Sequence, residues 1–337
     1  MTARGAQDLA AIYGGRRALV TGGLGFIGSQ LARRLLVLGA EVSLIDALVP
    51  GHGGNPFNVE DVRDRLAVTQ ADVCDRAAIE AAVAGQDYVF HLAGQVSHTD
   101  SMRDPASDLD HNCRASLSVL EACRRQNPTV RVAFAGTRQI YGRPQRLPMD
   151  ESHPIRPVDV NGVHKWAAEQ YHRLYHEVHG LPSVVLRLTN TYGPGQLVKH
   201  PRQGFIGWFV RKVVEGGEIE IMGDGSQLRD LNFVDDVADA LLVAASAPAA
   251  WGQVYNLGAP EPVSLESLAQ RLVAIAGRGS YRFVPFPPER KSIDIGSVRI
   301  DYGKIRRELG WEPRVGLRDG LTRTVRYYEQ HLHHYVD

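Results

Sequence analysis

A chain of 337 residues is long enough for one large domain, or for two fused lobes with a substantial core. Its 38 basic and 38 acidic residues balance, which argues against a nucleic-acid binder and against docking on anionic membranes. No apolar run approaches the roughly 20 residues of a membrane span, and the N-terminus lacks the apolar core of a signal peptide. The 3 cysteines have no metal-binding spacing and favour a reducing, cytoplasmic setting.

Segments rich in β-forming residues alternate with helical segments through the first half of the chain. The strands are expected at residues 17–21, 41–46, 66–70, 88–92, 130–135 and 184–188. Long helices are expected at residues 26–38, ended by Gly39, at 104–125, starting near Pro105, and at 162–179. Strands separated by helices form βαβ units, and right-handed crossovers arrange them into a doubly wound parallel sheet. The sequence therefore predicts an α/β fold of the Rossmann type.

The regular alternation breaks at about Gly193, and glycines and prolines become dense beyond it. We predict a Rossmann domain over residues 1–192 and a smaller, substrate-binding lobe over residues 193–337. Residues from about 230 to 258, with a helix at 237–245, are expected to return to the main sheet. No low-complexity linker separates the two lobes, so we expect them to be interleaved.

A glycine-rich turn lies between the first strand and the first long helix. Gly22 permits a tight turn, Gly25 lets the backbone approach a pyrophosphate, and Gly28 lets the helix pack close to the sheet. The N-terminus of that helix supplies N–H groups and partial positive charge for phosphates. Asp46 ends the second strand, where a carboxylate suits the hydroxyls of an adenosine ribose and repels the 2′-phosphate of NADP. The pattern predicts NAD as the cofactor; the alternative for Asp46 is a simple turn residue.

This turn and later segments resemble the extended short-chain dehydrogenase/reductase family, specifically its NAD-dependent sugar-nucleotide epimerases and dehydratases. The resemblance covers nearly the whole chain and rests on the segments TGGLGFIGSQL, ADVCD, HLAGQ, RLTNTYGP, GDGSQLRDLNFVDD and LGWEP. It implies that NAD contacts Gly22, Gly25, Phe26, Ile27, Gly28, Asp46, Asp72, Val73, Leu92, Ala93, Gly94 and Lys165.

The resemblance also implies a nucleoside-diphosphate sugar as substrate, bound by Gln95, Asn190, Arg229 and Arg290. Asn190 would touch the phosphate or sugar, and Arg229 would pair with the diphosphate, as suits a bidentate guanidinium. Arg290 would lie at the ribose or phosphate of the nucleotide. A surface salt bridge is the alternative for Arg229 and equally for Arg290. No metal site is expected.

Two helices of related proteins pair with those of a second copy to form a four-helix bundle, and we expect a homodimer of this kind. The two corresponding helices here carry apolar side chains along one face: Leu109, Cys113, Leu117, Leu120, Val163, Trp166, Leu174 and Val178.

The catalytic helix departs from the family. The family's enzymes use Tyr-x-x-x-Lys, in which the lysine lowers the pKa of the tyrosine and the phenolate takes a proton from a sugar hydroxyl. Here the tyrosine position holds Asn161, whereas Lys165 is present and Thr137 fills the family's Ser/Thr position. An amide has no useful acid–base pKa. We therefore expect Asn161 at the place of the general base, Lys165 on the nicotinamide ribose and Thr137 on the reacting hydroxyl.

Three explanations for Asn161 remain open. The base of an active enzyme is relocated, for example to His164, His98 or Tyr141; the reaction needs less help from a base; or the chain binds NAD without catalysis. His164 should point about 100° away from Lys165 around the helix.

The residues after Thr137 separate the candidate reactions. The 4,6-dehydratases usually carry Asp-Glu there, whereas this chain has Arg138 and Gln139, which disfavours a standard 4,6-dehydratase. The resulting hypothesis is an NAD-dependent epimerase that acts on a nucleoside-diphosphate sugar through a transient keto-sugar. The alternatives are a dehydratase or decarboxylase of such a sugar, and a non-catalytic protein that binds NAD and sugar nucleotides.

Overall fold

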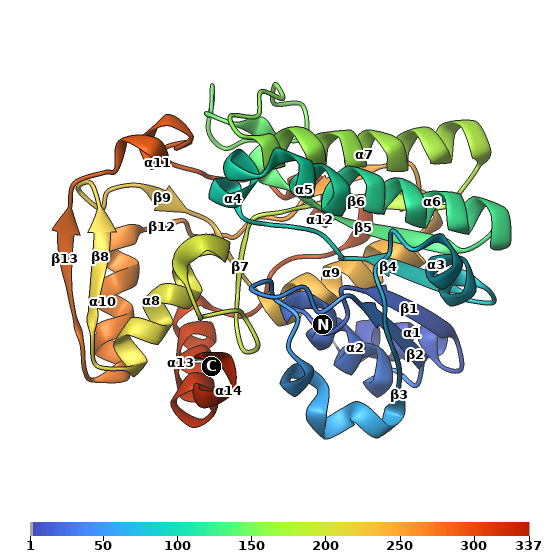
Figure 1. The fold of residues 1–337 in the computed structure, drawn as a ribbon, viewed down its shortest axis with the longest axis horizontal. Coiled ribbons are helices and arrows are strands. Elements are labelled where there is room, and N and C mark those ends of the chain that lie inside the picture. The colour runs from blue at the N-terminus through green and yellow to red at the C-terminus, as the bar shows by residue number, and fades with distance from the viewer. Residues whose placement is uncertain (1–2, 337) are drawn as a thin grey trace.

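The protein is described by a computed structural model that covers residues 3–336. Its centre is a seven-stranded parallel sheet with the order β11-β6-β5-β4-β1-β2-β3 (Figure 1). The strands are β1 (Arg17–Thr21), β2 (Glu41–Asp46), β3 (Leu66–Gln70), β4 (Tyr88–His91), β5 (Arg131–Thr137), β6 (Ser183–Leu188) and β11 (Val254–Asn256). The predicted Rossmann-type fold is confirmed. The order reverses between β1 and β4, and ligands bind at such a switch point, beyond the carboxyl ends of the strands.

Helices cover both faces of this sheet (Figure 1). On one face lie α1 (Ala3–Tyr13), α2 (Phe26–Val37) and α9 (Val234–Ser246), and on the other α3 (Arg76–Val83), α6 (Ala115–Gln126) and α7 (Val160–His179). Successive side chains of a strand point to opposite faces, so Val20 joins the core under α2 and α9, while Leu19 joins the core under α3 and α6. The sheet is therefore buried on both sides, as a parallel sheet requires.

The stretch predicted as one helix at 104–125 is interrupted in the structure. It consists of α5 (Pro105–Leu109), a π-helical turn (Asp110–Arg114) and α6, and α4 (His98–Arg103) precedes it. Such turns change which side chains face a neighbouring element and are frequent at functional sites. Cys113 and Leu120 are buried, whereas Leu109 and Leu117 are 46% and 38% exposed. Only part of the predicted apolar face is therefore exposed and available to a second copy of the chain.

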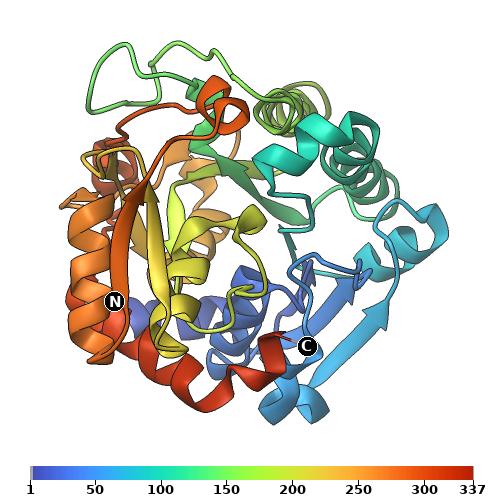
Figure 2. The same cartoon turned by 60° about the vertical axis from the view of Figure 1, so that its left-hand side comes forward.

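A second lobe, at the left of Figure 1 and in yellow to red in Figure 2, has its own hydrophobic core. It contains α8 (Phe205–Val214), β8 (Glu218–Met222), α10 (Leu265–Ala276), β13 (Ser280–Val284), α11 (Pro288–Ser292), α13 (Leu317–His331) and α14 (His333–Val336). Two small sheets pair β7 (Asn190–Tyr192) with β10 (Leu231–Phe233) and β9 (Leu228–Arg229) with β12 (Val263–Ser264). After β10 the chain returns to the large sheet through α9 and β11, and α12 (Gly303–Leu309) packs beside β11. Within residues 3–336, no helix combines the length and apolar character needed to cross a membrane.

Candidate active site

A cavity of about 830 Å³ lies at the carboxyl ends of the strands and is lined by both lobes. The turn after β1, the segment after β4, the end of β5 and the end of β6 form its wall on the side of the large sheet. Arg229 and Arg290 reach it from the second lobe. Its position is the one expected for the ligand site of a doubly wound sheet.

The glycine-rich turn has the geometry that a dinucleotide requires. Gly22 has a φ of +67°, and a Cβ there would lie 2.9 Å from the backbone nitrogen of Ala93. A Cβ on Gly28 would collide with the carbonyl oxygen of Gly22. Gly25 is the N-cap residue of α2, and no side chain caps this helix. The free N–H groups at the start of α2 are therefore available to phosphate oxygens.

Asp46 fixes this turn and also faces the cavity. Its two carboxylate oxygens accept hydrogen bonds from the backbone N–H groups of Leu24 (3.0 Å) and Leu48 (2.9 Å). Burial raises the pKa of Asp46 above its ordinary value, although both hydrogen bonds oppose the rise. Every residue that the resemblance assigns to NAD lines the cavity. These residues fit an NAD molecule.

Lys165 and Thr137 both line the cavity. Lys165 is 7% exposed, and its amino group lies 5.2 Å from the ring centre of Phe134. Burial lowers the pKa of Lys165 to about 8. The hydroxyl of Thr137 accepts a hydrogen bond of 3.1 Å from the backbone of Gln139 and caps the short 3-10 turn that follows β5.

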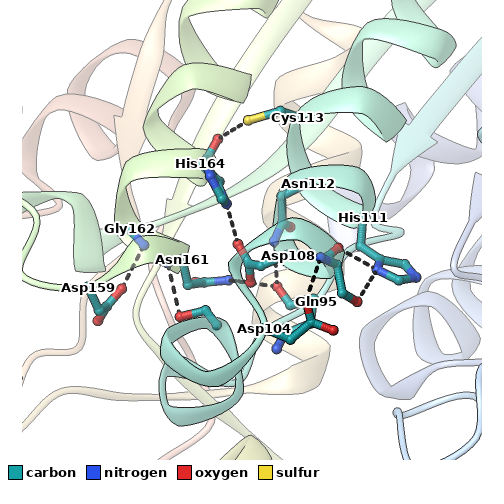
Figure 3. A network of polar contacts seen from close by, with 12 residues as sticks. Gln95, Asp104, Asp108, His111, Asn112, Cys113, Asp159, Asn161, Gly162 and His164 are labelled. Carbon is teal, nitrogen blue, oxygen red and sulfur yellow. Dashed lines mark hydrogen bonds and ion pairs between the residues drawn. The ribbon is translucent and has the colours of Figure 1, made fainter.

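Asn161 lines the cavity but its amide nitrogen is fully engaged (Figure 3). It donates to the backbone oxygen of Gln95 (2.9 Å) and to the carboxylate of Asp108 (3.1 Å). The other carboxylate oxygen of Asp108 lies 2.7 Å from Nδ1 of His164. Both amide hydrogens are thereby used, so Asn161 keeps only its amide oxygen for a ligand and has no proton to exchange.

Of the three side chains considered as a relocated base, only His98 lines the cavity. His164 is turned toward Asp108, outside the cavity lining, as its place on the helix predicts. Tyr141 is fully buried and bonds through its hydroxyl to Asn256 and Arg187, and burial raises its pKa to about 12.

His98 forms a pair with a buried carboxylate. Its Nδ1 lies 3.1 Å from Oδ2 of Asp159, while the His98 side chain is 39% exposed. Asp159 is the N-cap residue of α7 and accepts hydrogen bonds from the backbone of Gly162 and the side chain of Gln139, both at 2.7 Å. Burial alone would raise the pKa of Asp159, but these contacts hold it below its ordinary value. Asp159 is the residue that the sequence interpretation missed, since its role depends on packing against α4.

On the substrate side, the structure brings Asn190, Arg229 and Arg290 to the cavity. Arg229 bonds to the carbonyl oxygen of Gly296 at 2.6 Å and lies 3.7 Å from Asp294. Gln95 is different: it is 4% exposed, its side chain bonds to the backbone of Ser97, and it does not line the cavity. Its backbone oxygen, which holds Asn161, is the part that serves the site.

Comparisons with known proteins agree with this geometry. Residues 18–258 match the model of the NAD dependent epimerase/dehydratase family. The UDP-glucose 4-epimerase of Mycolicibacterium smegmatis is 35% identical over 93% of this chain and 98% of its own. The structure of the UDP-glucose 4-epimerase of Thermotoga maritima with UDP-glucose superposes with a TM-score of 0.84 at 31% identity, covering 94% of this chain and 99% of its own.

A dehydratase is similarly close. The structure of the dTDP-glucose 4,6-dehydratase of Streptomyces venezuelae with NAD bound has a TM-score of 0.85 at 29% identity, and covers 93% of this chain and 97% of its own. The chain therefore belongs to the NAD-dependent epimerase/dehydratase family of the extended short-chain dehydrogenases/reductases.

Proposed function

We propose that the chain is an NAD-dependent epimerase that acts on a nucleoside-diphosphate sugar through a transient keto-sugar. Both epimerases and dehydratases are among its relatives. The epimerase is favoured because Arg138 and Gln139 stand where a standard dehydratase carries its acidic pair. Arg138 and Gln139 line the cavity, and neither is an acid.

The observation that carries this proposal is the pair of His98 and Asp159 at the cavity. A neutral imidazole accepts the proton of the sugar hydroxyl and returns it later, and the buried carboxylate stabilises the imidazolium between the two steps. Thr137 bonds to the reacting hydroxyl and Lys165 to the nicotinamide ribose. Bound NAD would supply a reversible acceptor for the hydride of the sugar carbon, so that no second substrate would be consumed.

The second lobe supports the binding of the diphosphate. Arg229 and Arg290 line the cavity beyond Asn190, and guanidinium groups bind phosphate oxygens bidentately. Arg229 is held in place by the carbonyl oxygen of Gly296 at 2.6 Å and by a longer ion pair with Asp294 at 3.7 Å.

A homodimer is part of the proposal. Six apolar side chains of α5, α6 and α7 are between 38% and 62% exposed: Leu109, Leu117, Val163, Trp166, Leu174 and Val178. Exposed apolar patches of this kind mark protein–protein contacts. The α5–α6 segment and α7 of a second copy would cover the patch, and the four helical segments would form a bundle.

The cysteines Cys74, Cys113 and Cys123 are free thiols, which supports a reducing, cytoplasmic setting.

A panel of UDP-, dTDP-, CDP- and GDP-sugars, incubated with the purified chain, tests the function. An epimer formed without net NADH supports the epimerase, loss of water or carbon dioxide supports a lyase, and tight binding without turnover supports a non-catalytic protein. The variant His98→Asn should lower kcat by a factor of about 10²–10⁴, the range for a general acid–base group, while NAD binding is retained. The matched control is His179→Gln, at the exposed end of α7. Wild-type kcat in His98→Asn would exclude the assigned role.

A further inference from the structure

Two arginines of the large-sheet lobe are almost completely buried, and they differ in how their charge is balanced. Arg187 is 3% exposed and forms a double hydrogen bond with the carboxylate of Glu169, at 2.9 and 2.6 Å. Arg138 is 8% exposed, and among residues 3–336 no carboxylate lies within the ion-pair distance of 4.0 Å from its guanidinium. Burying a charge is costly unless the charge is paired, so the guanidinium of Arg138 would be stabilised by an anion that binds beside it.

The partners that Arg138 has are neutral. One terminal nitrogen donates to the side-chain oxygen of Gln139 at 2.6 Å, and the other to the side-chain oxygen of Asn190 at 3.2 Å. Amide oxygens accept hydrogen bonds but bring no negative charge. A guanidinium has five N–H donors, so donors remain beyond these two bonds.

Three carboxylates act on the charge of Arg138, but each lies beyond the ion-pair distance from its guanidinium. Asp159 is held by His98, Gln139 and the backbone of Gly162, and Asp294 lies beside Arg229. Asp230 accepts a hydrogen bond from the backbone of Ile300 through one carboxylate oxygen, its other oxygen has no hydrogen-bond partner among the described residues, and burial raises its pKa to about 7. Burial, reinforced by the charge of Arg229, lowers the pKa of Arg138 to about 10, whereas the ion pair with Glu169 raises the pKa of Arg187 despite its burial. Arg138 is thus a buried cation that has no ion pair within 4.0 Å among the described residues, and Asp230, Asp159 and Asp294 offset its charge only from a greater distance.

The position of Arg138 indicates where the missing anion sits. Arg138 lines the cavity and directly follows Thr137, the residue assigned to the reacting hydroxyl of the sugar. Arg229 and Arg290 provide positive charge for a diphosphate from the other lobe. Arg138 therefore lies between the place assigned to the reacting hydroxyl and Arg229, whose charge acts on it.

We propose that Arg138 binds a carboxylate carried by the sugar, so that the preferred substrate is a nucleoside-diphosphate uronic acid or another acidic sugar nucleotide. This inference rests on the proposed function, since it places the sugar beside Thr137. Arg138 would bind an anionic oxygen in either case, and the diphosphate of the substrate is the alternative source of that oxygen to a sugar carboxylate. Gln139 also bonds to both Arg138 and Asp159, so the carboxylate site adjoins the His98–Asp159 pair.

Binding to the NAD-loaded protein, measured by calorimetry, separates the two sources. The probes are UDP, UDP-glucose and UDP-glucuronic acid. We expect UDP-glucuronic acid to bind at least about 30-fold more tightly than UDP-glucose, the lower end of what a buried charge pair contributes. Arg138→Gln should abolish this preference and leave the Kd of UDP unchanged, and Arg138→Lys should retain part of the preference. The control is Arg146→Gln, since Arg146 is half-exposed and pairs with Asp150 outside the cavity.

Each other outcome overturns the assignment in a different way. If Arg138→Gln weakens UDP and both sugars equally, Arg138 binds the diphosphate. If the wild type binds UDP but does not prefer the acidic sugar, the carboxylate site is refuted while the proposed function stands. If none of the three probes binds, the proposed function for UDP-sugars fails and the inference fails with it. Thermal unfolding with and without NAD establishes that each variant is folded.

Discussion

The side-chain nitrogen of Asn161 lies 3.1 Å from a carboxylate oxygen of Asp108, and it also donates to the backbone oxygen of Gln95. These bonds tie the first turn of α7 to α5 and to the segment after β4 (Figure 3). Asp108 is 1% exposed and depends on Asn161 and His164 for its hydrogen bonds. Asn161 is therefore a structural part of the buried polar network, in addition to occupying the position of the family's catalytic tyrosine.

Replacing Asn161 with tyrosine should therefore harm the protein instead of restoring a lost activity. The phenol cannot reproduce both amide hydrogen bonds, and Asp108 loses a partner in a buried position. We expect the free energy of unfolding to fall by about 1–3 kcal/mol in urea titrations, with no increase in kcat on any sugar nucleotide that the wild type converts. Activity that appears only in Asn161→Tyr would instead identify the natural chain as a non-catalytic protein.

The pairing of His98 with Asp159 predicts the effect of Asp159→Asn. Asparagine still caps α7 through its side-chain oxygen, so the fold should be retained, but the charge that stabilises an imidazolium is lost. We expect kcat to fall by at least about tenfold, as for other losses of acid–base support, while the Kd of NAD changes little. Asp75→Asn is the matched control, because Asp75 caps α3 in the same way, away from the cavity. An equal kcat for both variants would remove Asp159 from the mechanism.

Local sequence patterns were sufficient for the sheet and the cofactor turn. β1, β2 and β3 coincide with the predicted segments because each is a short run rich in β-forming residues, and the glycines of the turn have steric requirements that only glycine meets. The sequence identifies Asn161 as the residue at the tyrosine position because Lys165, four residues later, occupies the lysine position of the motif.

Local sequence patterns could not predict which side chains pair at the site. His98 and Asp159 are brought together by the packing of α4 on α7, and Asp108 and Asn161 by the packing of α5 on α7. Gln95 was predicted as a substrate ligand from its place in the HLAGQ segment, but the chain bends so that its side chain bonds to Ser97. Neither the helix packing nor the bend has a signal in periodicity.

Asp46 should control the choice between NAD and NADP. In Asp46→Asn the amide can still accept a hydrogen bond, but the negative charge that repels a 2′-phosphate is gone. We expect the ratio of Kd for NADP to Kd for NAD to fall by at least about tenfold, in line with the loss of one charged interaction. A general loosening of the turn would weaken the binding of NAD and NADP by similar factors, so it would leave the ratio of the two Kd values unchanged. A ratio equal to that of the wild type would assign Asp46 only to the turn.

His91 makes stability depend on pH. It is fully buried between Thr21 and Ser116, and burial, with the charge of Lys165, lowers its pKa to about 3. An unfolded histidine has a pKa of about 6.5, so below that pH the unfolded chain binds a proton that the folded chain does not.

This contribution is complete above about pH 6.5 and is lost as the pH falls toward 3, by up to about 1.4 kcal/mol per pH unit. In urea titrations from pH 6.5 to 4.5, His91→Gln should lower the slope of the free energy of unfolding against pH by up to this amount. His179→Gln, at the exposed end of α7, should keep the slope of the wild type. Equal slopes for His91→Gln and the wild type would show that His91 is protonated in the folded chain.

The exposed apolar face of α6 and α7 predicts a dimer that a single charge can dissociate. Trp166 and Leu174 are 38% and 51% exposed on α7, and a second copy would bury both. In Trp166→Glu and in Leu174→Glu, association would bury two like charges on an apolar surface, which costs several kcal/mol. We therefore expect sedimentation equilibrium to report a mass near the 37.1 kDa of one chain. Val37→Glu is the control, because Val37 is 74% exposed on α2, on the opposite side of the large sheet, and this variant should remain dimeric. A wild type that is already monomeric would refute the bundle, and dissociation by Val37→Glu would place the interface on α2 instead.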